Sequence, residues 1–221
     1  MNVTEINIKG GFSGTNEGLI KAGGNVTLKY IQNQTVFSRG SLTFQREIID
    51  SKIYVKDKII GQGLQTSIIG GYLIAKDCIE AAYIGNQYGA LTRIEVGYDY
   101  DIKNIIQDKL TALQGYNKEA EKHNAVILKF SAMKRMSQAQ YAELKSVCEK
   151  FKNLSAIIEG LKAEIRELNK EIATPSKSYV KVSRTVYPGV KIIINGRHFD
   201  VMSPISSKTF ILSEGKEVIP C

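Results

Sequence analysis

The sequence predicts a mainly β protein with an α insertion, in which a β-solenoid (β-helix) is interrupted by one long antiparallel coiled-coil hairpin. Three observations lead to this prediction. Short strand-like segments separated by Gly, Asn or Asp repeat through residues 1–100. A heptad pattern of apolar residues then extends to Ala173, after which strand-like segments return. We therefore expect solenoid coils in 1–100, an antiparallel helical hairpin in 101–173, and strands that pack on or close the solenoid in 174–221.

The repeat in residues 1–100 is typical of stacked coils. Val26, Leu42, Ile59 and Ile79 occupy equivalent positions, 16, 17 and 20 residues apart. Alternation with a period of two buries one strand face, and one unit cannot cover that face alone, whereas stacked coils can. A β-sandwich of hairpins is the alternative, but these residues contain no Asn-Gly or Asp-Gly turn.

The remaining parts of the solenoid are its corners and its open ends. We expect Gly61-Gln62-Gly63 and Gly70-Gly71 to form corners, because glycine adopts the backbone conformations that tight turns require. An open solenoid end is a free strand edge that needs covering. We expect Met1–Gly14 or the C-terminal segment to cover one end.

Residues 137–173 predict the second helix of the hairpin. All nine seam positions of four successive heptads are apolar, which indicates a coiled-coil helix. Ser137 and Gln140 have the spacing of a capping box, which marks the start of this helix. Thr174-Pro175 should end it. The seam residues are Leu144, Phe151, Ile158, Ile165 and Ile172 at one heptad position and Val147, Leu154, Leu161 and Leu168 at the other.

The first helix, expected at Ile102–Met133, has a less regular seam. Ile106, Leu113, Ala120 and Ile127 recur every seven residues. Ile102, Tyr116 and Phe130 fall on the companion seam, but Lys109 and His123 share it. These two polar residues either fix the register of a hairpin within one chain or face solvent while the second helix pairs with another chain. The chain should turn near Lys134–Met136.

Strands return after the helices. Tyr179–Val182, Val190–Ile194 and Thr209–Leu212 have strand-like composition. Asn195-Gly196, between Val190–Ile194 and Arg197–Val201, predicts a tight β-hairpin.

Charge and cysteine content restrict the class of protein. The net charge of +8 is spread over the three parts as +1, +3 and +4, so it does not form the basic cluster that nucleic-acid binding favours. The sequence contains no apolar run long enough for a transmembrane helix. Cys78, Cys148 and Cys221 lack the paired spacing of disulfide or zinc sites. We therefore expect a reducing compartment, with Cys78 and Cys148 as small buried residues.

The sequence predicts no catalytic, cofactor-binding or metal-binding residue. His123 and His198 lie in no motif with a nucleophile, and Gly10–Gly14 reads as a turn because it lacks the Gly-Lys-Ser/Thr end of a phosphate-binding loop. A hexapeptide-repeat acyltransferase is a remote alternative, but its repeat does not persist and residues 1–100 contain no histidine to act as general base.

A non-enzymatic scaffold or adaptor is the function that these observations favour. The turn between the helices, Met133, Lys134, Arg135 and Met136, combines adaptable thioethers with positive charge and is our candidate partner-binding site. A plain solvated loop is the alternative for these residues. The alternative function is a self-assembling β-helix element, a homo-oligomer in which coils stack end to end or helices pair between chains.

The order of these parts resembles the bacterial flagellar assembly protein A family. The resemblance rests on the glycine-punctuated coils, such as Ala22–Val26, the long hairpin, the stretch Val186–Ile192, and Phe210–Gly215 near the end. It implies a right-handed β-helix, a cytoplasmic bacterial location, and a non-enzymatic role linked to flagellar assembly or polar organisation. Family members usually carry a domain ahead of the solenoid, and we expect this chain to start within the solenoid.

Overall fold

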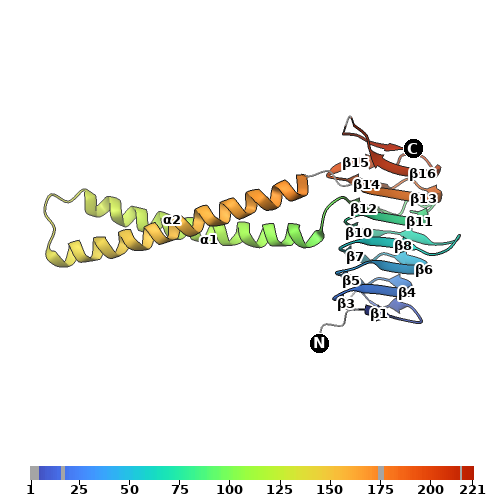
Figure 1. The fold of residues 1–221 in the computed structure, drawn as a ribbon, viewed down its shortest axis with the longest axis horizontal. Helices are drawn as coiled ribbons and strands as arrows, with labels where there is room; N and C mark the ends of the chain where they lie inside the picture. The colour runs from blue at the N-terminus through green and yellow to red at the C-terminus, as the bar shows by residue number, and fades with distance from the viewer. Residues whose placement is uncertain (1–4, 16–17, 174–176, 215) are drawn as a thin grey trace. The chain divides into compact units, whose positions relative to one another are not determined.

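The computed structural model describes residues 5–15, 18–173, 177–214 and 216–221. They divide into two compact units. The first joins Met1–Asp101 to Ile172–Cys221, and the second is Ile102–Glu171. The first unit is a solenoid whose strands stack into two sheets (Figure 1). The prediction of a mainly β solenoid with two helices is therefore confirmed.

Among the described residues, ten strands form one sheet and seven form the other. The first follows the order β1 (Glu5–Asn7), β4 (Asn25–Gln32), β6 (Leu42–Ile49), β8 (Lys58–Gly61), β11 (Cys78–Ile84), β13 (Tyr179–Val186), β16 (Ile205–Leu212) and β17 (Val218–Pro220). β2 (Phe12–Ser13) pairs with β4, and β9 (Ser67–Ile69) pairs with β6 and β11. The second follows the order β15 (Arg197–Asp200), β14 (Val190–Ile194), β12 (Thr92–Val96), β10 (Gly71–Ala75), β7 (Lys52–Val55), β5 (Thr35–Ser38) and β3 (Leu19–Ala22).

Successive coils stack in parallel register. Each coil supplies a strand to the second sheet and then one to the first, giving about four turns before the helices. Val26 pairs with Leu42, Leu42 with Ile59, and Ile59 with Ile79, and each of the four side chains is 0% exposed. The equivalence predicted for these positions is thus confirmed. Burying a side chain of this size contributes about 1.5–3 kcal/mol, so the column is a main source of stability.

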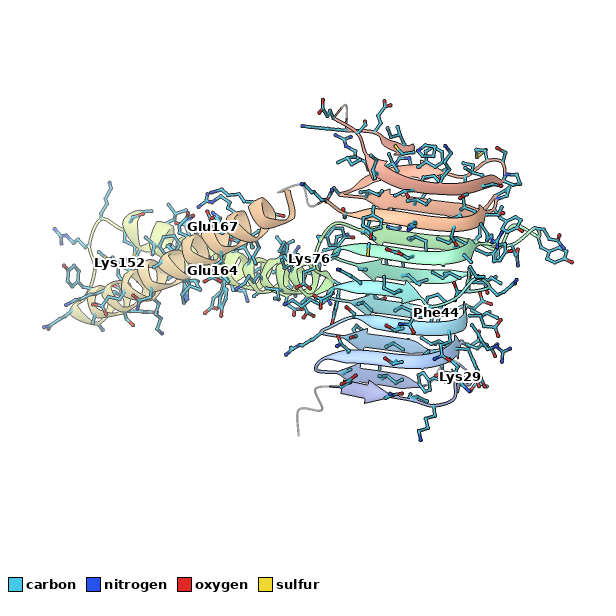
Figure 2. All side chains as sticks on the ribbon, turned by 45° about the vertical axis from the view of Figure 1, so that its right-hand side comes forward. Lys29, Phe44, Lys76, Lys152, Glu164 and Glu167 are labelled. Atoms are coloured by element: carbon cyan, nitrogen blue, oxygen red, sulfur yellow. The ribbon has the colours of Figure 1, made fainter. Side chains whose placement is uncertain are left out.

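The two faces of the first sheet differ as alternation requires. Phe44 in β6 lies inside the stack and is 0% exposed, whereas Lys29 in the neighbouring β4 is exposed (Figure 2). The third coil departs from regularity, because residues 62–66 separate β8 from β9. The Thr66 hydroxyl accepts a hydrogen bond from the Ala82 N–H at 3.0 Å, which keeps the next coil paired across that gap.

The predicted corner at Gly70-Gly71 lies between β9 and β10. Gly71 has a φ of 79°, and a Cβ atom there would stand 2.2 Å from the Ser51 carbonyl oxygen of the previous coil. No side chain fits at that distance, so glycine is required for the coils to approach each other.

Antiparallel strands cover the C-terminal end of the stack. β16 pairs antiparallel with β13 and β17, and β15 pairs antiparallel with β14. Ile194 pairs with Arg197, and the intervening Asn195 and Gly196 both have positive φ, 49° and 79°. This is the type I′ geometry predicted from Asn195-Gly196. At the other end β1 and β2 pair with β4, while Met1–Thr4 lies outside the described residues.

The chain leaves the solenoid after β12 and returns to it at β13. Gly97, just after β12, donates its N–H to the Lys76 carbonyl at 3.0 Å. Tyr179, the first residue of β13, donates its N–H to the neighbouring Asp77 carbonyl at 3.2 Å. The chain therefore leaves and rejoins the wall on adjacent residues of the coil below, and the β12–β13 coil keeps its register.

The second unit contains all but the ends of the two helices, α1 (Tyr100–Ser131) and α2 (Gln138–Ala173). α1 begins two residues before the predicted Ile102 because Asp99 caps it, its carboxylate accepting from the Asp101 N–H at 2.9 Å. α2 begins after Ser137, where the predicted capping box is confirmed. The Ser137 N–H donates to the Gln140 side chain at 2.9 Å, and the Gln140 N–H donates to the Ser137 hydroxyl at 3.3 Å. The expected stop at Thr174-Pro175 lies outside the described residues.

The side chains at the predicted α2 seam positions are buried or half-buried wherever the structure describes them. On α1 the two polar seam residues, Lys109 and His123, are half-buried. The Lys109 ammonium contacts the carboxylate of Glu164 on α2. The described α2 seam residues are Leu144, Val147, Phe151, Leu154, Ile158, Leu161, Ile165 and Leu168.

The cysteines are all free, but they differ in burial. Cys78 is buried as expected, whereas Cys148 and Cys221 are exposed. The prediction that Cys148 is buried is wrong. Cys148 directly follows the seam residue Val147, and one residue rotates an α-helix by about 100°, which directs this side chain away from the seam.

Candidate partner-binding site at the connection between the helices

The four candidate residues lie together in the connection between α1 and α2. The last turn of α1 tightens, with the Ala132 N–H donating to the Leu128 carbonyl at 3.2 Å and the Met133 N–H to the Phe130 carbonyl at 3.0 Å. The second of these bonds spans three residues, which is the usual way that an α-helix ends. α1 therefore stops two residues before the predicted Met133, and the connection occupies residues 132–137.

The connection exposes both apolar and charged side chains. Met136 is 37% exposed, Lys134 and Arg135 are exposed, and Met133 is half-buried. The capping box of Ser137 and Gln140 fixes where α2 begins, so these side chains are displayed between two defined helix ends.

Sequence reasoning missed two further apolar residues beside the connection. Leu128 on α1 is 60% exposed, and Tyr141 on α2 is 64% exposed. Both lie within about one helical turn of residues 132–137. They also lie outside the predicted seams, so packing between the helices does not account for an apolar residue at either position. The sequence could have identified both, because each is an apolar residue that lies outside the heptad seam near the end of its helix. We call Leu128, Met133, Met136 and Tyr141 the apolar tip residues.

The charge around the tip is positive. Residues 128–145 contain Lys129, Lys134, Arg135 and Lys145 but a single acidic residue, Glu143. In the part of the chain that the structure describes, none of the four basic side chains makes an ion pair. Exposed Met, Leu and Tyr side chains among unpaired cations can contribute apolar contacts and charge-assisted hydrogen bonds to a partner.

A second cluster that the sequence did not reveal lies on the outer face of the second sheet. The Glu95 side chain is 2% exposed, accepts a hydrogen bond from the Tyr72 hydroxyl, and lies 3.3 Å from the Arg93 guanidinium. Tyr98 also bonds to Glu95. Burial, followed by Glu95, raises the pKa of both Tyr72 and Tyr98 above the usual tyrosine value. The two phenols thus stay protonated and donate to the buried carboxylate.

Aromatic rings extend this cluster toward the start of α1. Phe37 and Tyr54 are stacked with their ring centres 4.7 Å apart, and Tyr100 lies 5.9 Å from each ring. Burial, with Asp101 and Asp99, raises the pKa of Tyr100 to about 12. Asp99, which caps α1, also pairs with Lys56 at 3.2 Å. These contacts fix the segment Tyr98–Tyr100, from which α1 departs, on the solenoid wall. The sequence could have identified this cluster from its aromatic residues at outward positions of successive coils, Phe37 and Tyr54.

The two histidines lie where the sequence placed them, His123 on a helix seam and His198 in the strand after Asn195-Gly196. His123 lies on the α1 seam 3.7 Å from Glu119, and His198 is exposed in β15, 3.7 Å from Asp200. Gly10–Gly14, interpreted as a turn, includes strand β2 at Phe12–Ser13. The described residues contain no group of three or more His, Cys, Asp or Glu side chains placed to hold a metal ion.

No helix among the described residues is both long and apolar enough to cross a membrane.

Comparison with known proteins supports the family resemblance. A family profile described as the Flagellar Assembly Protein A beta solenoid domain matches residues 3–218, which is nearly the whole chain. Searches of curated proteins and of solved structures found no match. The matched span includes both the coils and the two helices, in the order predicted from the sequence. This chain therefore belongs to the flagellar assembly protein A β-solenoid family.

Proposed function

We propose that this protein is a non-enzymatic scaffold or adaptor linked to flagellar assembly or polar organisation, and that the helical connection binds a protein partner. Family membership supports the link to flagellar assembly. The exposure of the apolar tip residues supports partner binding at the connection, since Leu128, Met136 and Tyr141 are 60%, 37% and 64% exposed beside unpaired basic residues. Exposed apolar side chains gathered with charge are typical of protein interaction sites.

A photo-cross-linking residue placed at Met136 tests this proposal in a bacterium that makes the protein. We expect it to capture a discrete partner, whereas the same residue placed at Ile157 on α2 should not. Ile157 is a matched control because it is apolar and 47% exposed but lies away from the connection. The same partner captured from both positions would contradict a site at the tip.

Substitutions then connect the site to the function. The double variant Met133→Ser with Met136→Ser should reduce partner capture and flagellation at least about tenfold. A tenfold loss of affinity corresponds to about 1.4 kcal/mol of binding free energy, which the loss of two apolar interface side chains can account for. Ile157→Ser should leave both unchanged. Normal flagellation in the double variant would remove the tip from the proposed function.

We further propose finer features of the architecture and location. The coils wind in a right-handed sense, α1 and α2 pair as an antiparallel coiled coil, and residues 101–173 form one insertion between the solenoid parts 1–100 and 174–221. The Lys109–Glu164 contact and the half-buried seams support the pairing. The three free cysteines support a reducing, cytoplasmic location. A crystal structure would decide the handedness directly.

Self-assembly is a second candidate function, favoured by one open strand edge. Among the described strands β3 pairs only with β5, and Leu19 in β3 is 51% exposed. An unpaired edge is able to accept a strand from another chain. Light scattering coupled to size-exclusion chromatography tests this idea. A mass that grows with concentration and is reduced by Leu19→Lys would support assembly, whereas a constant mass near 24.5 kDa would exclude it.

A further inference from the structure

We propose that the C-terminal strands of the solenoid form a binding pocket for an anion with an apolar body. The pocket has a volume of about 710 Å³. Tyr179, Ile211 and Leu212 contribute apolar surface to its walls, and Lys177, Lys181 and Lys216 add positive charge. Ligand pockets typically have volumes of about 300–1,000 Å³ and combine an apolar lining with a few polar groups. This inference is independent of the proposed partner site at the helical connection.

Strand pairing explains how the walls of the pocket arise. β13 and β16 are antiparallel, and their register pairs Tyr179 with Ile211 and Lys181 with Thr209. Side chains of directly paired residues emerge on the same face of a sheet, so an aromatic ring, a branched aliphatic chain and an ammonium group are adjacent there. Val180 and Phe210 form the pair between these two pairs, are 0% exposed and point into the solenoid.

The turn between β16 and β17 holds the third lysine. The Lys216 N–H donates to the Ser213 carbonyl at 2.9 Å, and the Ser213 N–H donates to the Glu217 carbonyl at 2.8 Å. Lys216 has a φ of 61°, an unfavourable conformation for a residue with a long side chain. Strained residues persist where surrounding contacts fix them, often at ligand sites. Here the turn places an ammonium group at the pocket wall.

The charge of the pocket favours an anion. In the described part of the chain, Lys177, Lys181 and Lys216 make no ion pair with a carboxylate, and Glu214 is the single acidic residue among the described lining residues. The Tyr179 hydroxyl donates to Glu80 at 2.7 Å, and this bond raises the pKa of Tyr179, so the phenol adds no negative charge. A carboxylate, sulfonate or phosphate group would satisfy the lysines while an apolar body covers Ile211 and Leu212.

Fluorescent dyes of the same shape but different charge test the proposal. We expect the full chain to bind anionic anilinonaphthalene sulfonate at least about tenfold more tightly than neutral phenylnaphthylamine, because only the anion engages the lysines. The double variant Lys181→Met with Lys216→Met should remove that preference but retain the weak binding of the neutral dye. Ile211→Asp should weaken both dyes.

Lys208→Met is the matched control, because Lys208 is an exposed lysine on the same strand β16 that does not line the pocket. It removes one charge and should leave the preference for the anionic dye unchanged. Thermal unfolding of each variant checks that it is folded. Equal loss of the preference in the Lys208 variant, or no loss in the double variant, would overturn the proposal.

Competition with unlabelled compounds distinguishes two sources of the ligand. Displacement of the anionic dye by decanoate, but not by phosphatidylglycerol vesicles, would identify a free apolar acid. Displacement by vesicles at equal lipid concentration would identify a lipid head group. Displacement by neither compound would contradict a pocket for apolar anions.

Discussion

The phenol of Tyr72 donates a hydrogen bond to the carboxylate of Glu95, a side chain of which 2% is exposed. These residues come from successive strands of the second sheet, β10 and β12, and both point outward from the solenoid. The Arg93 guanidinium lies 3.3 Å from the same carboxylate and 5.0 Å from the centre of the Tyr72 ring. A buried carboxylate is therefore retained on the wall beside the start of α1 because several donors converge on it.

Removing the Tyr72 hydroxyl should destabilise the solenoid. Tyr72→Phe leaves the buried Glu95 with one donor fewer, which costs about 1–3 kcal/mol in the free energy of unfolding. Tyr88→Phe is the matched control, since Tyr88 is 85% exposed and should change stability by less than about 0.5 kcal/mol. Urea denaturation of both variants measures the difference. Identical stability of the two variants would show that the Tyr72 bond contributes nothing to folding.

Stability should fall at high pH because of the buried tyrosines. The pKa of Tyr100 rises to about 12 in the folded protein from its ordinary value of 10.0. Between these values the unfolded chain loses the phenolic proton first, so deprotonation favours unfolding. The free energy of unfolding should be constant with respect to this group below pH 10.0 and decline from there to about pH 12.

Tyr100→Phe provides the check on that pH dependence. The variant should decline less steeply than the original protein over the same pH range, because one late-titrating phenol has been removed. Urea denaturation across the range measures the slope, and tyrosinate absorbance follows the titration itself. An unchanged slope in the variant would contradict the assignment of the effect to Tyr100.

Two glycines with equal free space should respond in opposite ways to alanine. A Cβ atom at either Gly196 or Gly115 would meet no atom within 4 Å. Gly196 has a φ of 79° in the type I′ turn, where a side chain is strained, so Gly196→Ala should destabilise by about 1 kcal/mol. Gly115 lies within α1, where alanine is favoured over glycine by about 0.8–1.0 kcal/mol, so Gly115→Ala should stabilise the helix.

Thermal melts followed by circular dichroism distinguish these effects. Because both sites have room for a methyl group, backbone conformation is the main difference between the two substitutions. A shift of the melting temperature in the same direction for both variants would mean that packing, rather than φ, determines the outcome. The Gly115 variant reports on the helical unit and the Gly196 variant on the solenoid.

Cross-linking should determine whether the helices pair within one chain. The Lys109 ammonium contacts the Glu164 carboxylate, so a zero-length carbodiimide reagent should join these two side chains. In a mixture of isotopically light and heavy protein, the joined peptides should be uniformly light or uniformly heavy. Mixed peptides at a statistical frequency would instead show that α2 pairs with another chain.

Lys109→Met is the control for that experiment. It removes the reactive amine and should abolish the cross-link. The ion pair itself is partly exposed, with 58% of the Glu164 side chain accessible, so its loss should change stability by less than about 1 kcal/mol. A large loss of helix in this variant would contradict the small contribution to stability that is expected of a partly exposed ion pair.

The solenoid class was predictable because the evidence for it is local and repetitive. Val26, Leu42, Ile59 and Ile79 recur at nearly constant spacing, and period-two alternation determines which side chains face inward. The two helices were predictable for the same reason, since the heptad and the Ser137–Gln140 capping box are short-range patterns. The Asn195-Gly196 turn also depends on two adjacent residues alone.

The tertiary structure decided what depends on contacts between distant residues. Glu95 meets Tyr72 because two coils stack, and no spacing in the sequence indicates that a carboxylate would be buried on an outer face.

The sequence by itself thus determined the type and order of the elements in this protein. Backbone periodicity and turn chemistry are set by neighbouring residues, so they can be recognised in a single amino-acid sequence. Where the chain leaves and rejoins the solenoid, and which side chains surround Lys216 and Ile211, became visible only in three dimensions. Gly97 and Tyr179 bond to the adjacent carbonyls of Lys76 and Asp77, and this proximity follows from coil stacking, a non-local interaction between residues that are distant in the sequence.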